Sequence, residues 1–538
     1  MVIFPLLLSC ETPEVETPKA AVELPPAMEI GRLAARLSLD LIGRRPTEAE
    51  LDALEAEPAG LDAQIDTWMA DPGFEERVVS LFADIYRTRT DHYVVGADGD
   101  VEFLDVGYRA RFMRSVGEEP LRLLARVAAD DLPWTDVVTA DWSMGDDLLI
   151  HHFPVEEVVA GGSGWRQVRY LDNRPAVGVL GTNGMWWRYT TTADNANRGR
   201  SAALSRVLLC DERYDRSVDF TKSNASSNVT ERIATDPTCI GCHVTLDPLA
   251  STLYGFWRHH PESYTEALRY YTSREEDWSK HSTVAPSYYG QPVDSLYDVG
   301  RAVAADPRFV NCAVKQVWTF LLRRAPEVDE WDRFSEDRQA FLDSGLKLRA
   351  AFRAVADDPF YRSDAGAWAG TTAPRRLTPD QLASSVEALT GYLWTVEGGV
   401  DAMVNDDYGY RVLDGGIDGA LVTDRPTTAT ATVSLVEERL AEAAGPYAAE
   451  TEASVAESER TLFREIADLA AEPTDAEISA QIVALVRRVH GRSILADSEE
   501  VVEMVALWRT LNEASAGPTS TWGLFLSALL RHADFVHV

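Results

Sequence analysis

The sequence lacks long apolar runs, and it is poor in basic residues and in cysteine. Beyond its first few residues, no run reaches the ~18 apolar residues that a membrane-spanning helix needs. The 51 basic residues are outnumbered by 86 acidic ones, which gives a formal net charge of −35. Such a surface repels phosphate, so the charge argues against nucleic-acid binding and disfavours adsorption to anionic lipid. Five cysteines in 538 residues exclude a small, disulfide-dense fold.

Motifs of several common enzyme classes are also missing. The chain has no G-x-S-x-G, no H-E-x-x-H, no P-loop and no G-x-G-x-x-G in a strand–helix context. The remaining composition, with 45% hydrophobic and 25% charged residues, is that of a globular protein. A chain of this length buries a large core and holds about three to five domains.

The first ten residues predict an export signal. They are apolar, and Leu7-Leu8-Ser9-Cys10 has the form of a lipobox, at which a bacterial lipoprotein is cleaved and lipidated on its cysteine. The apolar stretch is short and no basic residue precedes it, as expected if the true start lies upstream. Residues 11–27 are rich in Pro and Glu and predict a disordered tether. The alternative is an ordinary apolar N-terminus with a chance cysteine.

A lipid anchor at Cys10 sets the expected location. We expect contact with the membrane through this anchor only, in the periplasm or at the cell surface. Glu11 stands where an aspartate often retains lipoproteins at the inner membrane, so the outer membrane is favoured.

The strongest chemical signal is Cys239-Ile240-Gly241-Cys242-His243, which is the C-x-x-C-H pattern of c-type haem attachment. Two thiols at this spacing form thioethers with the two vinyl groups of one haem, and the adjacent histidine ligates the iron. We therefore expect one covalent haem c. A thioredoxin-like pair should open a helix after a strand, whereas this motif lies between breaks at 235–238 and 246–248. A zinc knuckle would need two further ligands at short spacing, and none is nearby.

Cys210 and Cys312 remain after the anchor and haem cysteines are assigned. In an oxidising compartment two such cysteines are expected to pair, which would close a loop of about a hundred residues around the haem motif. The alternative is two buried free thiols. Counting thiols with and without reductant separates the two.

The second axial ligand of the iron is open. No methionine lies between His243 and Met403, so the candidates are His259, His260 and, upstream, Met185. Another residue, or an open position that binds a small ligand, is also compatible with the sequence. For His259 and His260 the alternative is a pair of surface residues beside a proline.

Two further clusters have a structural and a functional interpretation. Asn195, Asn197 and Arg198 precede a helix, where capping by Asp194 or Asn197 is the simpler interpretation and contact with a haem propionate or a ligand is the other. The aromatic residues that follow Met185 either pack in a core or line a glycan-binding groove.

Hydrophobic periodicity predicts a mainly α, multi-domain protein with a c-type haem segment and an irregular, slightly β middle region. The expected segments are a signal (1–10), a tether (11–27), a helical N-terminal domain (28–90), a mixed middle region (91–197), a haem c domain (198–365) and a helical C-terminal domain (374–538). Helices are expected at 30–41, 47–55, 61–70, 74–86, 108–116, 121–129, 198–210, 295–304, 312–322, 341–355, 379–390, 434–443, 458–470, 475–489, 499–513 and 521–530, and a β run at 167–170. An Asp-Pro step before an aromatic residue, at 71–74, 306–309 and 358–360, is expected to end a helix.

Short segments carry a resemblance to a known family. They are residues 32–47 (RLAARLSLDLIGRRPT), 239–249 (CIGCHVTLDPL), 200–210, 309–324 (FVNCAVKQVWTFLLRR), 375–381 (RRLTPDQ) and 529–536 (LLRHADFV). They resemble the modules of the planctomycete-type cytochrome c family, exported bacterial proteins built of domains of unknown function. The resemblance implies a haem c and an envelope location, adds weight to a Cys210–Cys312 pair, and implies no substrate. His259-His260 departs from the family pattern and leaves the ligand set open.

From the sequence we expect a mono-haem c-type cytochrome that acts in electron transfer in the cell envelope. Its acidic surface suits a redox partner protein with a basic docking surface. One alternative is a haem-dependent oxidoreductase, peroxidase- or oxygenase-like, that acts on a small molecule or an envelope polymer. The other is a glycan-binding scaffold in which the haem is ancillary.

Overall fold

The computed structural model is 63% helical, which confirms the mainly α fold. The structure describes residues 26–89, 105–192, 195–214, 229–256, 269–280, 284–364, 375–396, 399–405, 409–419, 421–426 and 430–538. Cys10, most of the tether, His259 and His260 lie outside these residues. Within them, no helix combines the length and the apolar character that crossing a membrane requires.

Five helices form the N-terminal part: α1 (Ile30–Ile42), α2 (Glu48–Ala56), α3 (Leu61–Ala70), α4 (Pro72–Tyr86) and α5 (Val106–Ala129). The predicted start of α2 is confirmed, because Thr47 accepts the Glu50 N–H at 3.2 Å and the Glu50 carboxylate accepts the Thr47 N–H at 2.6 Å. The two helices expected at 108–116 and 121–129 are one helix, α5, which continues through Pro120. The proline cannot donate to the Val116 carbonyl, and Gly184 packs closely against that carbonyl instead.

Each Asp-Pro step ends a helix, which confirms the expectation, because α3, α12 (Leu296–Ala305) and α15 (Leu348–Asp357) stop there. Two of the steps also begin the next helix. Asp71 caps α4 by accepting the Gly73 N–H at 2.7 Å, and Asp306 caps α13 (Pro307–Leu322) by accepting the Arg308 N–H at 2.9 Å. In both cases the proline is the first helical residue, where its missing N–H costs no hydrogen bond. Phe74 and Phe309 therefore belong to the following helices, α4 and α13.

The middle region holds a small antiparallel sheet. Its strands are β1 (Ser143–Gly145), β2 (Val155–Glu157) and β3 (Arg166–Tyr170), in the order β1-β3-β2. Strand β3 confirms the β run expected at 167–170. Two short helices, α6 (Asp147–His152) and α7 (Asn183–Arg188), lie beside it in the sequence.

The segment expected to hold the haem is helical with one hairpin. It contains α8 (Arg198–Leu209), α9 (Val229–Thr235), α10 (Pro237–Ala250), β4 (Ser287–Tyr288), β5 (Gln291–Pro292), α12 (Leu296–Ala305), α13, α14 (Trp331–Asp343) and α15 (Leu348–Asp357). The single helix expected at 341–355 is divided between α14 and α15. Gly345 and Leu346 both have positive φ, and Leu346 turns back so that its carbonyl accepts the Trp134 N–H.

The C-terminal part contains α16 (Pro379–Thr390), β6 (Thr395–Val396), β7 (Val400–Asp401), α17 (Ala431–Ala453), α18 (Asp475–His490), α19 (Glu499–Ala514), α20 (Pro518–Leu530) and α21 (Ala533–Val536). The helix expected at 458–470 does not form. Buried side chains satisfy its backbone instead, because Glu452 accepts N–H groups from residues 461–463 and Arg460 donates to the carbonyls of Phe463 and Ile466. Short 3₁₀ turns lie at Pro58–Gly60, Trp134–Val138, Gly178–Gly181, Glu212–Tyr214, Ser251–Leu253, Thr272–Lys280, Val328–Glu330 and Glu457–Glu459.

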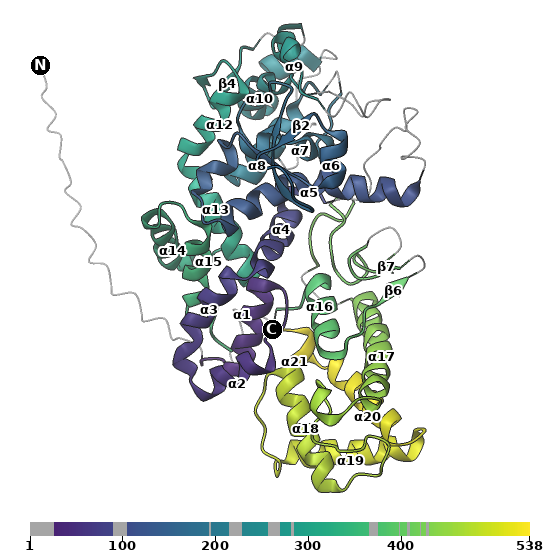
Figure 1. The fold of residues 1–538 in the computed structure, drawn as a ribbon. Helices are drawn as coiled ribbons and strands as arrows, with labels where there is room; N and C mark the ends of the chain where they lie inside the picture. Colours follow the sequence, from purple (N-terminus) through teal and green to yellow (C-terminus); the bar gives the residue numbers. More distant parts are fainter. Residues whose placement is uncertain are drawn as a thin grey trace, which may run out of the picture.

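Two large hydrophobic cores organise these elements, and a small third cluster around Phe112 joins α5 to α6. The larger core draws residues from all three segments expected between 28 and 365, such as Leu37, Val137 and Phe352. The smaller core is built from the C-terminal helices and includes Leu39 of α1. Figure 1 shows α9 and α10 toward one end of the molecule and α18 and α19 toward the other, with α1 and α16 between them.

A buried carboxylate joins the two cores. Asp40 of α1 is fully buried and accepts hydrogen bonds from Tyr361 (2.9 Å), Arg375 (3.2 Å), Arg323 (3.3 Å) and Gln381 (3.1 Å). These partners come from the end of α13, the segment after α15 and the start of α16. Three of the segments that carry the family resemblance thus meet at one carboxylate.

Candidate haem-attachment site

The C-x-x-C-H motif lies in the first half of α10. Asp236 caps this helix by accepting the Thr238 N–H at 2.8 Å, and Pro237 is its first residue. Because residues three and four apart share a helix face, Cys239, Cys242 and His243 lie on one arc of α10. All three are half-buried, and both thiols are free.

The context of the motif differs from that of a redox or a zinc pair. Helix α9 precedes α10, so the described part of the chain lacks the strand that a thioredoxin-like pair would follow. Among the described residues, neither thiol belongs to a compact group of three Cys, His, Asp or Glu ligands. The donor set of two thiols and one imidazole therefore fits a covalent haem better than these alternatives.

Asp247 holds the imidazole of His243. It lies four residues after His243 on the same face of α10, and its Oδ1 is 2.8 Å from His243 Nδ1. Asp247 is also bound by Arg198 of α8, with Nε 2.7 Å from Oδ1 and Nη2 3.2 Å from Oδ2. The bond uses Nδ1, and within the described part of the chain Nε2 of His243 is left available to ligate a metal.

The carboxyl of Asp247 stays ionised in this position. Asp247 is 7% exposed, and burial by itself raises its pKa. The hydrogen bonds from His243 and Arg198 and the charge of Arg198 outweigh burial, so the pKa of Asp247 lies below its usual value. An ionised carboxylate only accepts hydrogen bonds, so His243 carries its proton on Nδ1.

The second half of α10 anchors the site in the protein. Residues 246–250 are buried, whereas Ile240 and Val244 in the first half are 37% and 61% exposed. The break expected at 246–248 is wrong, since α10 continues through Pro248 to Ala250. Ser251 closes the last turn, where its N–H and, at 3.0 Å, its hydroxyl both donate to the Asp247 carbonyl. The helix is thus fixed at one end and presents the motif at the other.

The other predicted site residues have different surroundings. Met185 is fully buried in the larger core, so ligation by its sulfur would require that core to open. Trp186 is also buried there and donates to the Leu180 carbonyl, which favours core packing over a glycan-binding groove. Cys210 and Cys312 are brought together, with a sulfur–sulfur distance of 2.12 Å. His259 and His260, the other predicted candidates for an iron ligand, lie outside the described residues.

The asparagines before α8 act locally. Asn195 caps the helix, because its Oδ1 accepts the Gly199 N–H at 3.0 Å. Asn197 makes no such bond and instead accepts from Arg200 at 3.2 Å. Capping by Asn197 is therefore wrong, and Asp194, the other predicted cap, lies outside the described residues. Arg198, a predicted propionate or ligand contact, is bound to Asp247.

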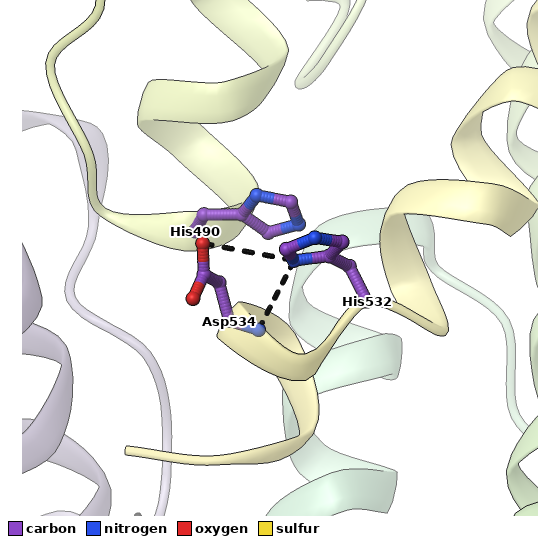
Figure 2. Close-up of side chains that lie close together, drawn as sticks. All are labelled: His490, His532 and Asp534. Atoms are coloured by element: carbon purple, nitrogen blue, oxygen red, sulfur yellow. Dashed lines mark hydrogen bonds and ion pairs between the residues drawn. The ribbon is translucent and has the colours of Figure 1, made fainter. Parts of the chain in front are cut away.

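A second histidine cluster was missed by the sequence reasoning. His490, His532 and Asp534 lie at the junction of α18, α20 and α21, with potential ligand atoms within 4.8 Å of one another. Figure 2 shows the two rings stacked, with Asp534 beside the Nδ1 of His532. Forty-two residues separate His490 from His532, so no local spacing could reveal the cluster.

Several polar atoms of this second cluster bond within the protein, whereas the buried Nδ1 of His490 has no hydrogen-bond partner among the described residues. His490 is 2% exposed and its Nε2 lies 3.0 Å from the Leu529 carbonyl, to which it donates. His532 Nδ1 accepts the Asp534 N–H at 3.2 Å, and Asp534 Oδ2 pairs with Arg492 at 3.0 Å. Burial lowers the pKa of His490 to about 4. The cluster fastens α21 to α18 and α20, and Arg492 occupies the carboxylate that a metal would need.

No family model, no curated protein and no solved structure matches this chain.

Proposed function

We propose that this chain is an exported, lipid-anchored c-type cytochrome that transfers electrons in the cell envelope. One haem would be bound through Cys239 and Cys242 and ligated by His243. The observation that carries this proposal is the arrangement on α10, where two free thiols and the imidazole share one half-buried face. The lipid anchor at Cys10 and the location at the outer membrane, in the periplasm or at the cell surface, rest on the sequence.

The residues present fit the chemistry of attachment. Each thiol adds to one vinyl group, so that a C–S bond forms and the hydrogen of the thiol moves to the neighbouring vinyl carbon. This step needs thiols that are unbridged and accessible, as Cys239 and Cys242 are. A bound haem supplies one-electron exchange at its iron.

The chain's own residues would position this group. His243 offers Nε2, while Asp247 fixes the ring through Nδ1. Ile240 and Val244 add exposed apolar surface next to the motif, which a porphyrin would cover with a gain in free energy. The buried second half of α10 keeps these groups in place.

A spectrum of the denatured protein tests the attachment. The chain is expressed with haem-maturation machinery, denatured and assayed as the pyridine complex of its haem. We expect one covalent haem per chain, and none in the double variant Cys239→Ala, Cys242→Ala. Gly241→Ala, which changes the same turn where an added methyl group meets no neighbour within 4 Å, is the matched control and should retain the haem. A folded, exported wild-type chain without covalent haem would contradict the proposal.

A haem-dependent oxidoreductase is the second candidate function. The carboxylate on His243 Nδ1 favours it, because an electron-rich axial ligand supports the oxidised iron on which such enzymes rely. Carbon monoxide added to the reduced protein separates the two functions. An electron-transfer site with both axial positions filled should not bind it, and a stable adduct would instead support the oxidoreductase.

The redox partner would be a protein with a basic docking surface. The net charge of −35 steers such a partner toward this chain over a distance set by ionic screening. The rate of electron exchange with a basic partner should therefore fall as salt is added. A rate that does not depend on salt would remove this part of the proposal.

A further inference from the structure

Asp247 and Arg198 form a second layer behind His243 that the proposed function does not by itself require. The Asp247 carboxylate is nearly buried, and it is held on one side by the imidazole and on the other by two nitrogen atoms of Arg198. The two residues come from different helices, α10 and α8, which pack against each other. The pair therefore has a fixed position that does not depend on α10 alone.

We infer that Asp247 is a positioning residue that fixes His243 as the Nδ1–H tautomer and strengthens its Nε2 as an electron donor, and that Arg198 moderates this effect. The inference rests on the proposed haem at Cys239 and Cys242. A carboxylate that accepts the Nδ1 proton increases the basicity of the other ring nitrogen, as carboxylate–histidine–metal arrangements do. The positive charge of Arg198 draws electron density from the same carboxylate and limits that gain.

The direction of the effect follows from the charges. A stronger donor stabilises oxidised iron more than reduced iron, so Asp247 lowers the reduction potential of the site. Arg198 has the opposite influence, both through the carboxylate and through its own charge. The potential of the site is thus set by the balance between the Asp247 carboxylate and the Arg198 charge.

Variants of the two residues should move the potential in opposite directions. Asp247→Asn removes the negative charge and should shift the equilibrium toward reduced iron by about tenfold, which is about 59 mV for one electron. Arg198→Met should shift it toward oxidised iron. Asp357→Asn is a matched control, because it removes an exposed carboxylate from another i, i+4 ion pair, with Arg353. Unchanged potentials, or shifts of the same sign, in variants that retain the haem would overturn the inference and leave the proposed function standing.

A second readout does not depend on the haem. In chain labelled with ¹⁵N-histidine, the ring nitrogen shifts report which nitrogen carries the proton, and His243→Gln identifies the signals. We expect Nδ1–H for His243 in the haem-free chain and a mixture of tautomers in Asp247→Ala. An Nε2–H tautomer in the wild-type chain would overturn the inference whether or not haem attaches. Failure of attachment with an intact Nδ1–H tautomer would count against the proposed function alone.

Discussion

Two clusters in this chain combine a histidine, an aspartate and an arginine, and they use the histidine differently. In the first, His243 Nδ1 bonds the Asp247 carboxylate at 2.8 Å, beside two free thiols. In the second, His532 Nδ1 accepts a backbone N–H and lies 3.6 Å from the Asp534 carboxylate. The first arrangement leaves Nε2 of a half-buried ring for a ligand, and the second uses its polar atoms to fasten a helix.

The comparison shows that residue type does not decide the role of such a cluster. The carboxylates differ in burial, since the side chain of Asp247 is 8% exposed and that of Asp534 is 24% exposed. They also differ in what surrounds the histidine, which is the exposed start of a helix in one case and the stacked ring of His490 in the other. The two histidines differ in what their Nδ1 bonds. His243 Nδ1 bonds a carboxylate, which leaves Nε2 for a metal, whereas His532 Nδ1 accepts a backbone N–H and holds α21 in place.

The largest expected effect concerns the loop that contains the first cluster. Cys210 and Cys312 enclose α10, whereas the second cluster lies outside this loop. Cys210→Ser with Cys312→Ser should lower the free energy of unfolding by about 4–5 kcal/mol, because the unfolded chain regains loop entropy. Urea unfolding measures this difference. If the double variant destabilised only α18–α21, the disulfide would not stabilise the region that contains the first cluster.

The next effect concerns the pH dependence of the second cluster. The pKa of His490 is about 4 in the folded chain and 6.5 is its ordinary value, so the unfolded chain binds more protons between these values. Stability should therefore rise by about 3 kcal/mol from pH 4 to pH 6.5 and be lost as the pH falls.

Urea unfolding at several pH values measures this dependence. His490→Gln should reduce the slope between pH 4 and 6.5, while Val244→Ala, which keeps His490, should retain it. An unchanged slope in His490→Gln would show that other groups carry the pH dependence.

A smaller effect separates the two aspartates. Asp247→Ala should cost about 2 kcal/mol, because it leaves the partly buried Arg198 and His243 without their acceptor. Asp534→Ala, at a more exposed ion pair, should cost about 0.5–1 kcal/mol. Equal costs in thermal or urea unfolding would mean that the burial of the two carboxylates does not distinguish the clusters.

The smallest expected effect is that of zinc on the second cluster. Zinc binding would require the Asp534 carboxylate to leave Arg492, so added zinc should not raise the melting temperature. The experiment uses the Cys239→Ala, Cys242→Ala variant, so that the thiols do not contribute. Stabilisation by zinc that disappears in His532→Ala would identify the second cluster as a metal site. The two clusters would then not differ in their ability to bind a ligand.

Local signals in the sequence predicted much of the fold. The capping box at Thr47 and the apolar period of α1 depend on neighbours within four residues, and both are confirmed. The rule that proline ends a helix failed at Pro120, where Gly184 packs against the interrupted Val116 carbonyl, and at Pro248, where the buried second half of α10 continues to Ala250. The apolar periodicity at 458–470 wrongly predicted a helix. The buried side chains of Glu452 and Arg460 bond the backbone of this segment, and periodicity carries no information on such bonds.

The candidate site shows the same division. The spacing of Cys239, Cys242 and His243 is a local signal, and its helical face follows from it. The i, i+4 relation between His243 and Asp247 is visible in the sequence, but the break expected at 246–248 argues against one helix that contains both residues. The Arg198–Asp247 pair spans 49 residues and depends on how α8 packs on α10, which no sequence spacing encodes.

The mass of one peptide tests the central claim most directly. Trypsin should release residues 233–258, between Arg232 and Arg258, as a peptide that contains Cys239, Cys242 and His243. In protein exported with haem-maturation machinery, we expect this peptide to carry the mass of one haem and no free thiol. The unmodified peptide, or one with a bond between its two cysteines, would contradict the account.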